Sequence, residues 1–346
     1  MKNLPILLLA MILPSELWSQ PRKPATVAEI AAYNGPDREQ VLYAGAKGEE
    51  KIVWYTSLAG DSYKAIARGF EAKFPGVRLE AYRAGGSELV PRMIEEAKAH
   101  RPIFDAVETT EDSLMIAKTS QLVRPYFSPY LDKYPDNAKE RADKNLTFWT
   151  TIRESYLGFG YNKTQVSPHA VPKGFDGLLH PELKGKMGIT LNESSAKVIG
   201  AMIKIKGEGF VKRLKSQEIK AYTVSSAALV DMIASGEIGA SFHIFRNHAL
   251  VSAAKGSSVG WIAMELVPTN SGGVALAAQP PHPHAALLLI DFLLHDAVKI
   301  LDKFHYGHPT TDYGFKRWYQ DRGRSLADLE ADSARWEKLA KEITQR

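Results

Sequence analysis

The chain has 346 residues, of which 45% are hydrophobic, 10% aromatic and 24% charged, and it contains no cysteine. This composition is that of a folded globular protein, so it excludes disordered, collagen-like and coiled-coil chains, and the missing cysteine excludes disulfide scaffolds, thiolate metal sites and cysteine nucleophiles. The formal charge of +5 is small and is spread along the chain, so we expect no nucleic-acid partner.

The N-terminal residues have the pattern of a secretory signal. Lys2 precedes an apolar run over 4–13, which is shorter than the roughly 20 residues that a bilayer requires. We predict that residues 1–19 are a signal peptide, that no lipid anchor follows because no cysteine does, and that the mature protein is periplasmic. The alternative is that this run forms a buried N-terminal strand or helix.

The first half of the chain alternates between strand and helix patterns. After a polar lead-in over 20–50, the sequence predicts strands at 51–56, 77–82 and 104–108 and helices at 61–74, from Ser87 as N-cap, and at 111–118. Alternation of this kind predicts an α/β fold with parallel strands and helices on both faces of the sheet.

The same alternation returns after a segment rich in Pro, Tyr, Asp and Lys at 124–148. Strand patterns lie at 155–161, 187–190, 219–224 and 238–242, and another strand-like stretch follows Trp261. Helices are expected after Ser194 and Ser195, after Ser225 and from 245, and an apolar helix at 283–294. The segment 325–345 has the pattern of an amphipathic surface helix.

Small hydroxyl or glycine residues recur where a strand ends and a helix begins. In an open parallel sheet ligands bind at these carboxyl ends, where helix N-termini offer free N–H groups and a partial positive charge that suits anions. Five such points, split between the two halves of the chain, predict a two-lobed binding cleft. They are Thr56-Ser57, Gly85-Gly86-Ser87, Thr109-Thr110, Asn192 with Ser194-Ser195, and Ser225-Ser226.

Charged and aromatic residues near these points complete the candidate site. His243 and Arg246 follow a predicted strand end, and Arg153 beside Glu154 and Tyr156 lies where the chain crosses between the halves. The chain lacks the sequence signatures of nucleotide-binding loops, zinc proteases and serine hydrolases, so we expect no enzyme activity. The alternative enzyme would be an exported hydrolase that uses Glu154 or Glu108 with a histidine.

Several stretches resemble bacterial extracellular solute-binding proteins of ABC importers, and most of all the branch of ferric-iron-binding proteins. The resemblance rests on the segment from KIVWYTS to FDAVETTEDSL, on LGFGYNK and on QPPHPHAALLLIDFLL, which occur in the family's order over about 28–305.

The resemblance implies a type II periplasmic binding protein fold, with two α/β lobes, each a mixed and mostly parallel sheet flanked by helices, joined by two crossover segments near 149–161 and 262–272. Lobe 1 would comprise 51–150 and 267–346, and lobe 2 would comprise 151–266. A monomer of this family would close its cleft around one solute and deliver it to an ABC permease in the inner membrane. A sensory binding subunit on the same fold is a further alternative.

The resemblance leaves two classes of ligand open. Ferric-binding members use adjacent tyrosines after a strand of lobe 2, but 241–246 here reads SFHIFR. No cofactor is expected, a ferric ion would be cargo, and its weak candidate ligands are Glu108, Tyr156 and His243. The hydroxyl-rich loops with Arg153, His243 and Arg246 favour a small anion such as a phosphonate, a carboxylate or an anionic chelate.

Overall fold

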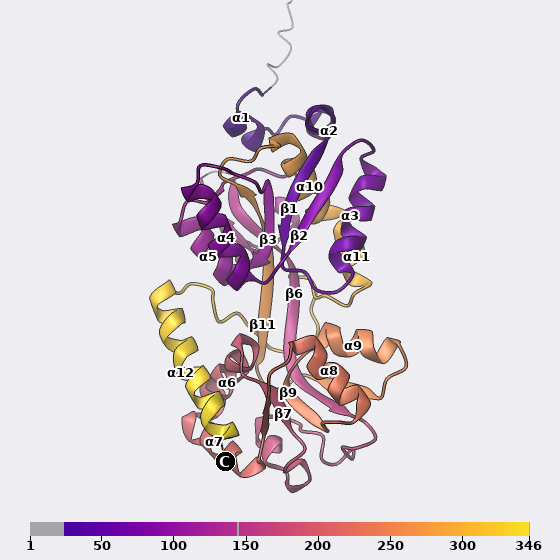
Figure 1. The fold of residues 1–346 in the computed structure, drawn as a ribbon, viewed down its shortest axis with the longest axis vertical. Coiled ribbons are helices and arrows are strands. Elements are labelled where there is room, and N and C mark those ends of the chain that lie inside the picture. The colour runs from indigo at the N-terminus through magenta and orange to yellow at the C-terminus, as the bar shows by residue number, and fades with distance from the viewer. Residues whose placement is uncertain (1–23, 144, 346) are drawn as a thin grey trace, which may run out of the picture.

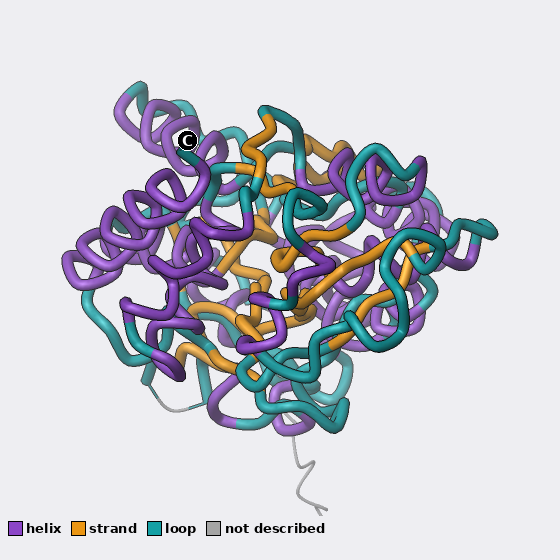
Figure 2. Tube along the Cα trace, turned by 90° about the horizontal axis from the view of Figure 1, so that it is seen from below, coloured by secondary structure: helices purple, strands orange, loops and turns teal. Residues whose placement is uncertain are grey.

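The computed structural model describes residues 24–143 and 145–345, and it has two lobes stacked along its longest axis (Figure 1). The predicted signal peptide lies outside the described residues. Strands lie inside and helices cover them, as the end-on view in Figure 2 shows. Among the described residues, no helix combines the length and the hydrophobicity needed to cross a bilayer.

The first lobe is built on three parallel strands, β3-β1-β2 in spatial order, with helices on both faces. Its aliphatic and aromatic side chains bury one core on each face of the sheet. The elements are α1 (Val27–Ala32), α2 (Arg38–Glu49), β1 (Lys51–Thr56), α3 (Ser62–Lys73), β2 (Arg78–Arg83), α4 (Gly86–Lys98), β3 (Ala106–Thr110), α5 (Glu111–Thr119), β4 (Val123–Arg124), β5 (Lys139–Arg141), α10 (Pro283–His295) and α11 (Ala297–Asp302).

Two long strands, β6 (Thr147–Asn162) and β11 (Val267–Ala277), run from one lobe into the other (Figure 1). They pair antiparallel because the chain leaves the first lobe along β6 and returns along β11. The sheet is therefore mixed: parallel among β1, β2 and β3, and antiparallel where β6 or β11 pairs with β3, β9 or β10.

The second lobe surrounds the far half of β6. Its two cores gather side chains from both sides of that strand. Its elements are β7 (Gly188–Thr190), α6 (Glu193–Lys206), α7 (Glu208–Arg213), β8 (Lys220–Tyr222), α8 (Ser226–Ser235), β9 (Ala240–Phe245), α9 (Arg246–Ala254) and β10 (Val259–Ile262).

The C-terminal helix α12 (Leu326–Thr344) packs on the second lobe. Trp336, Leu339 and Ile343 belong to the same core as the helices α6 and α7. The strands β6 and β11, which cross between the lobes, are called the hinge below. The chain reaches α12 along this hinge, where the short strand β12 (Arg317–Trp318) pairs with β11. The predicted first lobe includes all of 267–346, but α12 packs on the second lobe because its apolar stripe finds its partners on α6.

We expect Trp336→Ala to lower the free energy of unfolding by about 3–5 kcal/mol, because the 6% exposed indole fills a core position over Gly200. Urea unfolding followed by circular dichroism measures the change. The control is Lys338→Ala on the exposed side of α12, which should change stability by less than about 0.5 kcal/mol. Equal stability of the two variants would contradict the packing of α12.

Candidate functional site

A cavity of about 580 Å³ lies between the lobes, and it is called the cleft below. The first lobe contributes the ends of β1 and β3, the start of α4 and Tyr306. The second lobe contributes the start of α8 and the junction between β9 and α9, and β6 and β11 form the floor. The cleft therefore lies at the carboxyl ends of the parallel strands, as the sheet topology requires.

Arg153 on β6 is the central cation of the cleft. Its Nε donates to Glu108 Oε1 at 2.8 Å, and its Nη2 donates to Ser57 Oγ at 2.9 Å. Arg153 is 4% exposed and Glu108 is fully buried. Glu108 also accepts from Thr56 Oγ1 at 2.8 Å, which holds the carboxylate on one side of the guanidinium. The Nη1 of Arg153 donates to the carbonyl oxygen of Asn270 at 3.4 Å, so two of the five N–H groups of the guanidinium remain for a ligand.

The charge that lines the cleft is entirely positive among the described residues. Arg83 and Arg153 both line it, and no carboxylate does. Arg83 is exposed, and its Nε donates to the carbonyl oxygen of Leu58 at 3.2 Å. Glu108 stands behind Arg153 rather than in the lining. An anion that enters the cleft therefore meets two cations and no like charge.

Two helices begin at the cleft, one from each lobe. The N-cap of α4 is Gly85, which has no side chain to satisfy the first N–H groups of the helix. Gly86 is required by space, because a Cβ there would lie 2.2 Å from Ser113 Oγ. On the other side, Ser225 caps α8 by accepting from the Ala228 N–H at 3.1 Å. Both helix starts face the cavity with partial positive charge.

Four of the candidates from the sequence line the cleft together: Ser57, Gly86, Thr110 and Arg153. Three others from the same loops do not line it. Thr56 is bonded to Glu108, Thr109 is fully buried, and Ser87 is exposed inside α4, because the helix starts one residue earlier than its predicted N-cap.

Glu154 and Tyr156 face away from the cleft, because side chains alternate along β6. Glu154 is fully buried and accepts hydrogen bonds from Tyr156, Arg317 and Tyr319 at 2.7–2.8 Å. Burial and then the charge of Glu154 raise the pKa of Tyr156. The carboxylate of Glu154 thus joins the segment before α12 to β6, and both of its oxygens already accept hydrogen bonds.

The candidates from the second lobe also take structural positions. His243 is fully buried, its Nε2 accepts from the Thr190 N–H at 3.0 Å, and burial lowers its pKa to about 3. Arg246 stacks on the ring of Tyr313 at 5.2 Å. Ser195 closes the capping box of α6, with Ser194 beside it, and none of the four lines the cleft.

The weak metal candidates do not form a common site. Glu108 pairs with Arg153, Tyr156 donates to Glu154, and His243 is bonded to the backbone of β7. No cluster of three or more His, Asp or Glu side chains suited to a metal ion occurs in the part of the chain that the structure describes.

Several cleft residues were not among the candidates chosen from the sequence. Ser225 and Ser226 belong to a strand-to-helix point that the sequence did indicate. Ser155 lies two residues after Arg153, so strand alternation would have found it. Phe245 and His248 lie beside the candidate Arg246 in the sequence, whereas the remaining polar residues of the lining carry no such local signal: Tyr63, Arg83, Asn270 and Tyr306.

A buried ion cluster bridges the lobes beside the cleft. Lys197 on α6 pairs with Glu193 on the same helix, and its Nζ lies 3.6 Å from Asp321 Oδ2 and 3.9 Å from Asp112 Oδ2 on α5. Burial alone would lower the pKa of Lys197, but the three carboxylates outweigh it and raise that pKa. The cluster joins α5 of the first lobe to α6 of the second.

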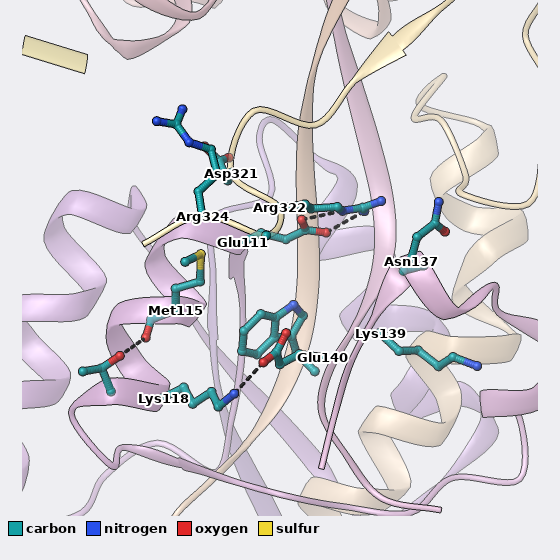
Figure 3. Close-up of a pocket in the computed structure, with 13 residues that line it drawn as sticks. Glu111, Met115, Lys118, Asn137, Lys139, Glu140, Asp321, Arg322 and Arg324 are labelled. Carbon is teal, nitrogen blue, oxygen red and sulfur yellow. Dashed lines mark hydrogen bonds and ion pairs between the residues drawn. The ribbon is translucent and has the colours of Figure 1, made fainter. Parts of the chain in front are cut away.

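A second cavity, of about 510 Å³, lies on the side of this cluster where the C-terminal segment passes α5 (Figure 3). Arg322 forms a bidentate ion pair with Glu111, with N–O distances of 2.8 and 2.9 Å, and Lys118 pairs with Glu140. Most of the charges around this cavity are paired with one another. The pair of Arg322 with Glu111 holds the C-terminal segment against the first lobe.

Comparison with known proteins places the chain among bacterial extracellular solute-binding proteins, whose family matches residues 65–303. The chain is similar in structure to the substrate-binding protein of an ABC transporter from Agrobacterium tumefaciens, with a TM-score of 0.73, 14% identity, and coverage of 87% of this chain and 97% of the other.

Two further solved structures have the same fold. Iron-bound HitA from Pseudomonas aeruginosa matches with a TM-score of 0.65 and 18% identity, over 85% of this chain and 99% of the other. AfuA from Actinobacillus pleuropneumoniae, solved with fructose-6-phosphate bound, matches with a TM-score of 0.61 and 19% identity, over 85% and 96%. The expected type II periplasmic binding protein fold is thereby confirmed.

We expect Arg317→Met to lower the free energy of unfolding by about 2–4 kcal/mol, because it removes a cation bonded to the buried Glu154. Adding Glu154→Gln to this variant should recover part of the loss, since the uncompensated charge is then gone. A double-mutant cycle in urea measures both effects. Additive losses from the two changes would contradict the coupling.

Proposed function

The chain belongs to the family of bacterial extracellular solute-binding proteins, and on this premise we propose that it captures a small anionic solute and delivers it to the permease of an ABC importer. The observation that carries the proposal is the charge of the cleft lining, which includes Arg83 and Arg153 and, among the described residues, no carboxylate.

The proposed contacts divide by lobe. On the side of the first lobe, Ser57, Thr110 and the backbone N–H groups at the uncapped start of α4 would bind the anion, together with Arg153 from β6. From the second lobe, the start of α8 at Ser226 supplies the opposing contact. Because the ligand bonds to both lobes only when they are close, binding favours the closed form.

A bare ferric ion is the less favoured cargo. Ferric iron prefers anionic oxygen ligands, and among the described residues that line the cleft only the phenols Tyr63 and Tyr306 could ionise to become such ligands. The match to iron-bound HitA keeps iron transport plausible, and an anionic iron chelate would suit the arginines. The match to AfuA with a sugar phosphate supports the anion instead.

We further propose that residues 1–19 direct the protein to the periplasm and that it acts there as a monomer. The two lobes would comprise 51–150 with 267–325, and 151–266 with α12. This division follows the sequence-based one, except that α12 is assigned to the lobe on which it packs.

Two alternative functions make less use of the site. A hydrolase would need a free carboxylate, but Glu154 is bonded to three donors outside the cleft and Glu108 is paired with Arg153. A sensory subunit would use the same cleft and differ in its membrane partner, so the neighbouring genes would distinguish it.

We expect calorimetry of the mature protein to detect binding of at least one anion in a panel of phosphate, methylphosphonate, glycerol 3-phosphate, glycerate, citrate and ferric citrate. Arg83→Gln should weaken that binding about tenfold or more, because a charge-assisted hydrogen bond is lost.

The matched control is Arg68→Gln on α3, an exposed arginine outside the cleft, which should bind like the unmodified protein. Tight binding of free ferric ion with no response to any anion would contradict the anion proposal. Equal effects of Arg83→Gln and Arg68→Gln on anion binding would contradict it as well.

A further inference from the structure

A third cavity, of about 380 Å³, lies next to the cleft. Both cavities are lined by Ala59, Gly60, Ala227, His248 and Tyr306, so they adjoin one another. The third cavity lies between α8 and α9 of the second lobe and the segment around Phe304. It is called the side pocket below.

The lining of the side pocket differs from that of the cleft. Val230, Val251 and Phe304 make it largely apolar, and no arginine lines it. Its charged residues are Asp61, Asp231 and Lys255, all of which are exposed and sit where the pocket meets solvent. A second anionic group would find no matching donor in its interior.

Two buried polar atoms in this lining have no hydrogen-bond partner among the described residues: Asn247 Oδ1 and His248 Nδ1. Asn247 is only 4% exposed, and leaving a buried acceptor unpaired costs about 1–3 kcal/mol. Burial lowers the pKa of His248 to about 4, so its ring is neutral at neutral pH. Neither Asn247 Oδ1 nor His248 Nδ1 is accessible to solvent, so a ligand donor would reach either atom only as the side chain rotates into the side pocket, whose open wall is largely apolar.

We infer that the solute is an organic anion whose charged group binds at the arginines and whose uncharged body, bearing a hydroxyl or N–H donor, extends into the side pocket toward Asn247. This inference rests on the proposed function, because it assigns the anionic group to the cleft. An inorganic oxyanion would leave the side pocket to water and Asn247 without a ligand donor.

The test compares each anionic group alone with the same group on a hydroxylated body. The probes are phosphate, glycerol 3-phosphate and glucose 6-phosphate, and acetate, glycerate and gluconate, each titrated by calorimetry into the mature protein. We expect at least one hydroxylated member to bind tenfold or more tightly than the bare anion of its series.

Two substitutions locate the preference. Val251→Trp fills the side pocket and should bring the ratio of the two affinities close to one, and Asn247→Leu should reduce it several-fold. The control is Ala254→Trp, on an exposed position of the same helix, which should keep the ratio. Circular dichroism and thermal melting show whether each variant is folded.

The outcomes separate this inference from the proposed function. If the bare anions bind as tightly as the hydroxylated members, or if both side-pocket variants keep the ratio, the inference is wrong and the anion-binding function stands. If no probe of either series binds, the inference is wrong, and the anion-binding function fails as well only if no anion of the earlier panel binds.

Discussion

Opposite charges buried where the lobes meet are the constraint on which the structure depends. Arg153 and Glu154 are consecutive on β6, so strand alternation sends one to each face of the sheet. Arg153 pairs with Glu108 on β3, and Glu154 pairs with Arg317 on the segment before α12. Each pair joins the hinge to another part of the chain, and losing one partner would leave a buried charge uncompensated. The hinge is thereby specified by charge as well as by backbone pairing.

The order of the elements could be predicted from the sequence, but the lining of the cleft could be predicted only in part. Hydrophobic period and N-cap residues are local signals, and they located β1, α3 and α5 to within one residue at each end. These local signals do not predict which of two adjacent residues faces the cleft. Ser57 lines it, whereas the side chain of the preceding Thr56 donates to Glu108. His243 and His248 look alike in the sequence, and only the pairing of β9 with β6 buries the first and brings the second to the cavity. Tyr306 reaches the cleft from a segment distant in the sequence, and no local pattern predicts that it lies there.

The same separation of faces keeps the carboxylates Glu108 and Glu154 out of the cleft lining. Glu108 stands behind the guanidinium it neutralises, and Glu154 points to the opposite face of β6. The groups left facing the cavity are hydroxyls, N–H groups and guanidinium donors, all of which can donate to an oxyanion. In a cavity with few competing acceptors, such donors discriminate by the charge and geometry of the ligand.

The attachment of α12 to the second lobe has a practical consequence. The helix α1 covers the outer end of the first lobe, and α12 ends near the outer end of the second (Figure 1). Fluorophores attached to α1 and to the last turn of α12 would therefore lie on different lobes. The energy transfer between the two fluorophores would change as the lobes move. The fold thus has the layout of a single-chain optical sensor for its own solute, without any need to insert a reporter into the hinge.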